Sequence, residues 1–356
     1  MNQRSVGLDL FRLLSVAFIF LFHSHIHIQC DYEPFNEYIN VSAIYMSAFF
    51  LLSGFANYLT WNSRDLRDIS VIRVFYLKRL VNIVPLYYVA AILYVLFLGR
   101  ESLYENVLLA PIELLGIQSS FASIFSVTHN GGTWFVSCIL ICYFIYPFIQ
   151  EIVKQLSHKT KLLLVAVGCF ILIYSPLIVI YFKTITTYSN PFYRVIEFAI
   201  GTIICSEMEE IKKSSASKYL FSWYSMLAEY FVLVVGVSMA VKKNNSIGDY
   251  MSYNWIVVPM FILNLITLAG MDFPKVMMRS RLLRYMCEIS YAFFLAQLFV
   301  WKMTLFALNE IGMDNNALRI IVSLLICTAI ATLSHEIVEK PIAKLFRRKT
   351  TGMCHA

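Results

Sequence analysis

The chain has 356 residues, of which 59% are hydrophobic and 14% are charged, and its mean hydropathy is +0.68. Soluble domains contain roughly a quarter charged residues, so this composition excludes an ordinary soluble enzyme, a disordered protein and a nucleic-acid-binding domain. The net charge of +7 alone would fit a polyanionic partner. The high apolar content instead predicts a polytopic membrane protein.

Ten apolar segments are candidates to span a membrane, because a spanning helix needs about 20 predominantly apolar residues. In chain order they cover residues 6–28, 39–60, 80–98, 132–150, 162–182, 191–206, 219–241, 253–271, 285–308 and 318–338. The longest connection, 99–131, contains an apolar stretch, 107–117, that is too short to span and is expected to be interfacial or re-entrant. The sequence predicts one all-α transmembrane domain over residues 1–356.

The basic residues are unevenly distributed between the two sides that alternating spans define. One side receives 21 of the 29 lysines and arginines and the other receives 6, while Arg12 and Lys302 fall within segments. Cytoplasmic loops carry an excess of Lys and Arg, so both termini are predicted to be cytoplasmic. The same rule accounts for the net charge, and we expect no nucleic-acid partner.

The first segment contains ionisable residues, which are costly in a membrane and usually face a bundle interior. Arg12 and His23 are eleven residues apart. At about 100° and 1.5 Å per residue they share one helix face, roughly 16 Å apart along the axis. This spacing predicts one wall of a polar path. Alternatively, Arg12 extends to the near interface or pairs with Asp9, and the histidines mark the far interface.

His23 and His27 also have the i, i+4 spacing of metal ligands. The only other candidate ligands beside them are Cys30 and Asp31 at the end of the segment. We therefore expect no metal.

Seven short motifs follow one another along the chain. They are Arg12 with His23; 49–55 (FFLLSGF); Lys78-Arg79-Leu80 with Pro85-Leu86-Tyr87; Trp134-Phe135 with Tyr143 and Pro147; Arg194 with Glu197, Phe198 and Gly201; Ile289-Ser290-Tyr291; and Glu339-Lys340-Pro341. In this order, over nearly the whole chain, they resemble the membrane-bound acyltransferase-3 family, in particular a branch that modifies surface polysaccharides.

The resemblance implies that an acyl group, most often acetyl, moves from cytoplasmic acyl-CoA to a hydroxyl of a glycan or a lipid-linked sugar. His23 would act as general base on that hydroxyl or would carry the acyl group transiently. Arg12, Lys78 and Arg79 would bind the CoA phosphates, because a guanidinium binds phosphate bidentately. Alternatively, Lys78 and Arg79 are ordinary cytoplasmic anchors of the positive-inside kind.

Three further residues are candidates for acceptor binding. Trp134 could stack on a sugar ring or belong to the aromatic belt at a membrane interface. Arg194 and Glu197 are three residues apart and could position the sugar or form an ion pair that avoids a lone intramembrane charge.

Three positions depart from the family pattern. Ile139 replaces a common Glu, Gln297 a common His and Asn82 a common Arg. These departures favour a polysaccharide-modifying branch with its own acceptor. They concentrate the chemistry on His23 and Arg12, with the pair Arg194 and Glu197 as a further candidate.

Two other classes fit the residues. A secondary transporter or lipid-linked sugar flippase also needs intramembrane Arg and His, although no duplicated halves are evident. A non-catalytic partner in glycan assembly would explain Ile139 and Gln297. In each case we expect an integral protein of the bacterial cytoplasmic membrane, with the lipid bilayer as its partner. No feature of the sequence defines an oligomeric state.

Overall fold

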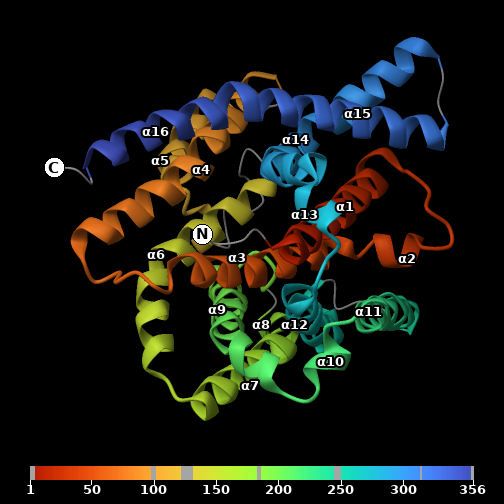
Figure 1. Cartoon of the computed structure of the whole chain (residues 1–356). Coiled ribbons are helices and arrows are strands. Elements are labelled where there is room, and N and C mark those ends of the chain that lie inside the picture. Colours follow the sequence, from red (N-terminus) through yellow and green to blue (C-terminus); the bar gives the residue numbers. More distant parts are fainter. Residues whose placement is uncertain are drawn as a thin grey trace. The chain divides into compact units, whose positions relative to one another are not determined.

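The computed structural model describes residues 5–97, 102–121, 131–182, 186–243, 250–312 and 315–353, and regular structure in these ranges is entirely helical (Figure 1). The longer helices are α1 (Val6–Ile28), α3 (Tyr45–Trp61), α4 (Ile69–Phe97), α5 (Leu103–Leu115), α6 (Trp134–Gln155), α7 (His158–Tyr174), α8 (Pro176–Phe182), α9 (Pro191–Lys213), α11 (Trp223–Lys243), α12 (Asn254–Gly270), α14 (Arg281–Ile311), α15 (Asn316–Ser334) and α16 (Lys340–Met353). The shorter ones are α2 (Asn36–Ile39), α10 (Ser217–Leu220) and α13 (Lys275–Arg279).

Within the described ranges, seven helices are long and apolar enough to cross a membrane, or up to nine if each of two bent pairs forms one span. The bends are 42° between α7 and α8 and 69° between the two parts of α14, Arg281–Gln297 and Phe299–Ile311. The predicted segment 191–206 is helical in α9, but Arg194, Glu197 and Glu207 make it too charged for this count. The structure confirms an all-helical integral membrane protein. Within the described ranges it has seven to nine candidate spans rather than the predicted ten.

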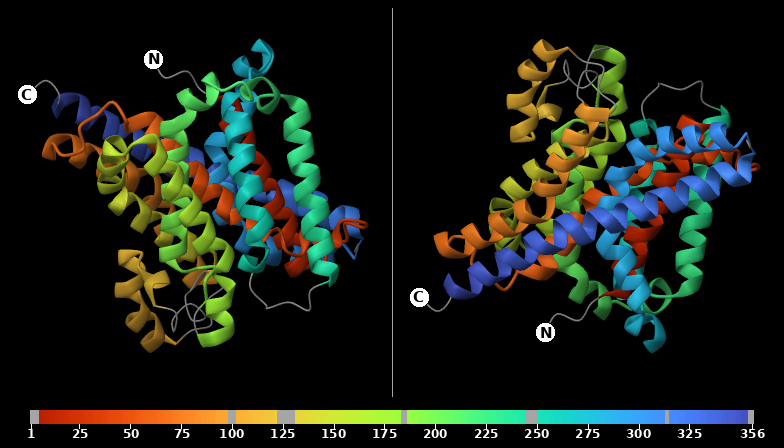
Figure 2. Two further views of the ribbon diagram at one scale, coloured as in Figure 1. Left: turned by 90° about the horizontal axis from the view of Figure 1, so that it is seen from below. Right: turned by 90° about the horizontal axis from the view of Figure 1, so that it is seen from above.

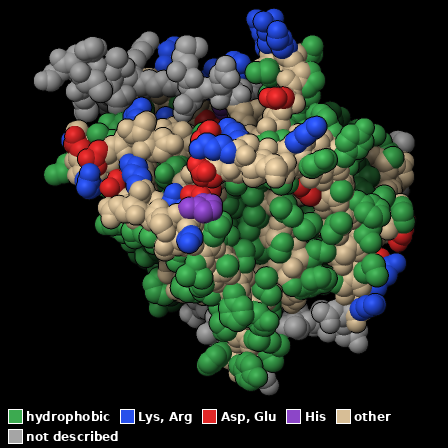
Figure 3. Space-filling view, turned by 60° about the horizontal axis from the view of Figure 1, so that its bottom comes forward, with side chains coloured by type: hydrophobic (Ala, Val, Ile, Leu, Met, Phe, Trp, Pro, Cys, Tyr) green, Lys and Arg blue, Asp and Glu red, His purple; other side chains and the backbone are tan. Residues whose placement is uncertain are grey.

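The outer surface fits this assignment. Hydrophobic side chains dominate the central and lower parts of the face shown in Figure 3, and most charged side chains lie in its upper part, with a few at its right edge. Large apolar side chains such as Leu163 and Phe170 of α7 and Phe231 of α11 are 60–68% exposed. Water would disfavour such a surface, whereas lipid tails would cover it at no cost.

Helix α4 begins at Ile69, earlier than the predicted third segment (80–98). The Asp68 carboxylate accepts hydrogen bonds from the hydroxyl and the backbone amide of Ser70 at 2.8 and 2.7 Å, and these bonds lower the pKa of Asp68. An acidic cap of this kind satisfies the free amides of a helix N-terminus. Lys78 and Arg79 therefore lie within a helix that extends beyond its apolar part, rather than in the loop before it.

The chain folds into two compact units. The first unit comprises Met1–Phe22, Tyr32–Arg64 and Ile145–Cys287, and the second comprises His23–Asp31, Asp65–Phe144 and Glu288–Ala356. Helices α3, α9 and α12 belong to the first unit, and α4, α5 and α15 belong to the second.

The close crossing of α3 and α9 organises the first unit. A Cβ atom on Gly54 would lie 1.9 Å from the carbonyl oxygen of Phe198, and one on Gly201 would lie 1.9 Å from that of Leu51. Only glycine fits at either position, as is common where membrane helices approach closely. The motif 49–55 and the motif around Glu197 therefore meet in a packing contact.

The second unit contains the connection that was predicted not to span. Its helix α5 has 13 residues and ends at Gly116, which has a positive φ of 65°. The hydroxyls of Tyr87 and Tyr88 donate to the carbonyls of Glu113 and Leu114 at 2.6 and 2.5 Å, which fixes the C-terminal end of α5 to α4. In the same unit α15 and α16 continue one another as a long rod that lies beside α4 (Figure 2).

Candidate active site

Helix α1 is continuous from Val6 to Ile28, so it carries both Arg12 and His23, as predicted. The imidazole rings of His23 and His27 are nearly parallel, 5.4 Å apart, and the indole of Trp301 from α14 lies 6.3 Å from the first and 6.0 Å from the second. His23 is half-buried and His27 is exposed. We call these three residues the histidine–tryptophan stack. The stack extends from the half-buried ring of His23 to the exposed ring of His27, within the second unit.

The C-terminal end of α1 is held by α15. One guanidinium nitrogen of Arg319 donates to the carbonyl of Ile28 at 2.8 Å, where a cation also favours the helix dipole. Asn316 exchanges two hydrogen bonds of 2.7 Å with the backbone of Asp31. Gln29 ends the helix with a φ of 54°. These contacts fix the turn that presents the two histidines of the stack.

Two polar side chains of α14 lie near Trp301 in the chain: Thr304 follows it by about one turn, and Gln297 stands just before the 69° bend. Gln297 is 2% exposed and Thr304 is fully buried. Neither the Gln297 amide nor the Thr304 hydroxyl has a hydrogen-bond partner among the described residues. Buried polar groups are nearly always paired, so these side chains have capacity to bind a polar ligand. From the sequence, Gln297 stood out only as a departure from the family pattern, and Trp301 and Thr304 carried no signal.

Arg12 lies on α1 in the first unit and is half-buried. Within the part of the chain that the structure describes, its guanidinium has no ion pair or hydrogen bond, so the alternative in which Asp9 neutralises it is not seen. Its planar donor fork thus remains available to an anion.

Lys78 and Arg79 lie in the second unit and differ in environment. Lys78 is exposed and Arg79 is half-buried, with its guanidinium 5.5 Å from the centre of the Phe75 ring and 5.2 Å from that of Tyr143. Such cation–π contacts orient the guanidinium. The exposed Asn82 stands one turn further along α4.

Trp134 begins α6 in the second unit, and its side chain is packed inside the protein. It is 6% exposed and its ring meets that of Phe135 edge-on at 6.4 Å. Its carbonyl accepts a hydrogen bond from the hydroxyl of Ser119 at 3.0 Å. This burial argues against a lipid-facing belt residue. Ile139, five residues further along α6, is also buried.

Arg194 and Glu197 form a fully buried ion pair in the first unit. Their side chains are 0% exposed, and the shortest N–O distance is 2.8 Å. Arg194 also donates to the hydroxyl of Ser47 at 3.0 Å and to the carbonyl of Tyr188 at 2.5 and 2.7 Å. These partners support the alternative in which the pair avoids a lone charge. A direct contact with sugar stays a prediction for both residues.

The described residues contain no group of three or more His, Cys, Asp or Glu side chains that could hold a metal ion. The candidate residues of the second unit are the histidine–tryptophan stack together with Gln297 and Thr304 of α14. Arg12 lies on the same helix as His23, in the part of α1 that belongs to the first unit.

The fold and these residues define a multi-pass membrane protein with an ionisable helix. The sequence profile of a family described as "Acyltransferase domain" matches residues 5–336, and the chain belongs to this acyltransferase-3 family. Neither a curated protein nor a solved structure matches the chain.

Proposed function

We propose that this protein is an integral membrane O-acyltransferase that moves an acetyl group from acetyl-CoA to a hydroxyl of a surface polysaccharide or its lipid-linked precursor. The observation that supports the proposal is the position of His23 in a chain of this family. Its imidazole is half-buried on α1, and Arg319 holds the C-terminal end of that helix.

In this reaction neutral His23 removes the proton of the sugar hydroxyl as the oxygen attacks the thioester carbonyl. The new C–O bond replaces the C–S bond, the thiolate of CoA leaves, and His23 returns the proton to sulfur. If His23 instead carries the acyl group, its nitrogen attacks first and the sugar hydroxyl then displaces the imidazole. Gln297, which stands where the family pattern has His, does not exchange protons, so the proton transfer is left to His23.

The donor side of the proposal uses Arg12, Lys78 and Arg79, whose charges suit the phosphates of CoA. For the acceptor we keep Trp134 and the Arg194–Glu197 pair as candidate binding residues. Because the pair is buried, it would act indirectly, by holding α3 and α9 in place. The distribution of basic residues supports cytoplasmic termini. We propose the bacterial cytoplasmic membrane as the location.

Arg12→Ala is expected to raise the dissociation constant of acetyl-CoA by about tenfold or more, since charged hydrogen bonds contribute about 1.5–3 kcal/mol. Arg12→Lys should recover only part of the loss, because an ammonium cannot replace a bidentate fork. Calorimetric titration of the two purified variants with acetyl-CoA measures both dissociation constants. An unchanged dissociation constant in Arg12→Ala would remove Arg12 from donor binding.

The proposed function is tested with the purified chain in vesicles that contain glycan from host membranes. Labelled acetyl-CoA should be consumed and the label should appear on the glycan. A transporter or flippase has no reason to consume the thioester, so intact acetyl-CoA together with glycan movement across the vesicle would favour that class.

A further inference from the structure

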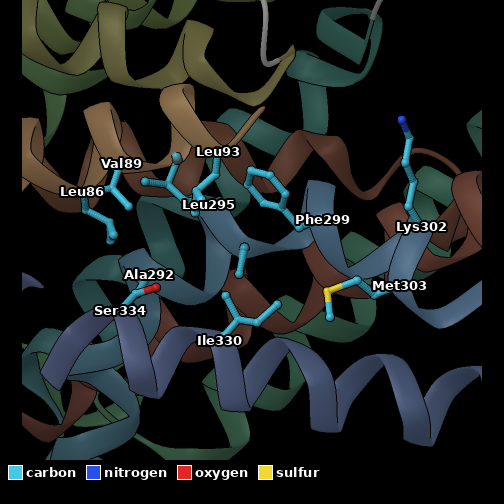
Figure 4. Close-up of a pocket in the computed structure, with 12 residues that line it drawn as sticks. Leu86, Val89, Leu93, Ala292, Leu295, Phe299, Lys302, Met303, Ile330 and Ser334 are labelled. Carbon is cyan, nitrogen blue, oxygen red and sulfur yellow. The ribbon is translucent and has the colours of Figure 1, made fainter. Parts of the chain in front are cut away.

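An apolar groove lies in the second unit, between α4, α14 and α15 (Figure 4). Its volume is about 470 Å³, which falls in the range of about 300–1,000 Å³ typical of ligand pockets. Its lining is apolar except for Lys302 and Ser334 and includes no acidic residue. Lys302 lies at one end, with Met303, and Leu86 and Val89 lie at the other (Figure 4).

Helix α14 presents different faces to this groove and to the candidate active site. Ala292, Leu295, Ala296 and Phe299 line the groove at i, i+3, i+4 and i+7 spacing. Trp301 points elsewhere and packs on the two histidines of the stack. The bend of 69° after Gln297 lies in the part of α14 that borders both.

Lys302 is an unusual residue for this position. It belongs to a segment predicted to span, it is exposed, and it has no ion-pair or hydrogen-bond partner within the described ranges. A lysine in a spanning segment is costly and commonly marks a binding function. An ammonium at the end of an apolar groove is complementary to a molecule with a long apolar chain and an anionic head.

We infer that the groove binds the hydrocarbon chain of a lipid phosphate that carries the acceptor sugar, with its phosphate on Lys302. This inference rests on the proposed function. Of the two acceptors named there, the surface polysaccharide and its lipid-linked precursor, it favours the precursor. Lys302 directly follows Trp301, whose ring lies 6.3 Å from that of His23. A phosphate on Lys302 would therefore hold the attached sugar near the turn of α14 that carries Trp301 on its other face.

The binding part is tested by native mass spectrometry of the whole protein with decaprenyl phosphate, decaprenol and phosphatidylglycerol as probes. We expect retention of decaprenyl phosphate in preference to the other two. Lys302→Gln should weaken the binding of decaprenyl phosphate about tenfold. A tenfold change corresponds to about 1.4 kcal/mol, close to the contribution of one charged hydrogen bond. Ala296→Phe, which fills the groove, should weaken both decaprenyl ligands. Lys243→Gln, an exposed lysine at the end of α11, is the matched control and should change nothing.

The catalytic part compares lipid-linked glycan from host membranes with the same glycan released from its lipid by mild acid. Wild-type protein should acetylate the lipid-linked form at least tenfold faster, and Lys302→Gln should remove this preference. Equal rates on the two glycans would overturn the inference and leave the proposed acyltransferase intact. Equal retention of phosphatidylglycerol would instead make the groove a site for bilayer lipid and would also overturn it. Transfer to neither glycan would contradict the proposed function itself, whatever the binding result.

Discussion

Cells that express His23→Ala at wild-type membrane abundance are expected to lose the acetyl-sized mass increment on each repeat of their surface glycan. A general base contributes about 10²–10⁴-fold to the rate, and a covalent carrier contributes at least as much, so transfer should fall below detection in either role. His23 is half-buried and makes a ring contact with Trp301, so its loss should leave the helices of the unit in place. Mass spectrometry of the isolated glycan is the measurement.

The matched control is His25→Gln, on the same turn of α1. His25 contacts the carbonyl of Cys30 at 2.7 Å rather than joining the stack, and glutamine can keep that hydrogen bond. We expect its glycan to stay acetylated. Unchanged acetylation in His23→Ala would contradict both roles, and a change only in glycan amount would favour the transport or assembly class.

The two roles of His23 differ in what happens without an acceptor. A carrier should release one equivalent of CoA per protein in a rapid burst, because the acyl group passes to the imidazole first. A general base should release none until the sugar is added. Stopped-flow detection of free thiol distinguishes them.

Arg194→Met is expected to be the most destabilising substitution, by about 3–5 kcal/mol, because it leaves the buried Glu197 carboxylate uncompensated. The double variant Arg194→Met with Glu197→Met should recover most of this loss, since it removes both charges. Thermal unfolding in detergent and abundance in the membrane are the two measurements. Lys212→Met, which breaks the exposed pair with Glu209 on the same helix, should have a small effect, below about 1 kcal/mol.

A different pattern would change the role of this pair. If Arg194→Met kept its melting temperature and lost transfer to the glycan, Arg194 would bind the acceptor directly. If the double variant were as unstable as the single one, packing of the long side chains, rather than charge, would hold α3 and α9 together.

The bounds of the membrane helices were predictable where they depend only on local apolar content. Apolar content predicted α1, α6 and α12 closely, because a helix in lipid must satisfy its own backbone hydrogen bonds. The start of α4 was predicted too late, because Asp68 and Ser70 begin the helix before its apolar part. The charges on α9 made segment 191–206 look short, although they are neutralised inside the protein and the helix has 23 residues.

Composition, hydropathy and the order of short motifs were sufficient to predict a helical membrane protein of the acyltransferase-3 family, with Arg12 and His23 on one helix. These properties depend on each residue and its near neighbours. The partners of the polar side chains depend on residues far away in the chain: Trp301 is 278 positions after His23, and Ser47 is 147 positions before Arg194. Only the tertiary structure shows that Arg194 is buried and hydrogen-bonded by several groups, whereas Lys302 has no hydrogen-bond or ion-pair partner among the described residues. The reason is that burial and hydrogen bonding depend on which helices pack against each other.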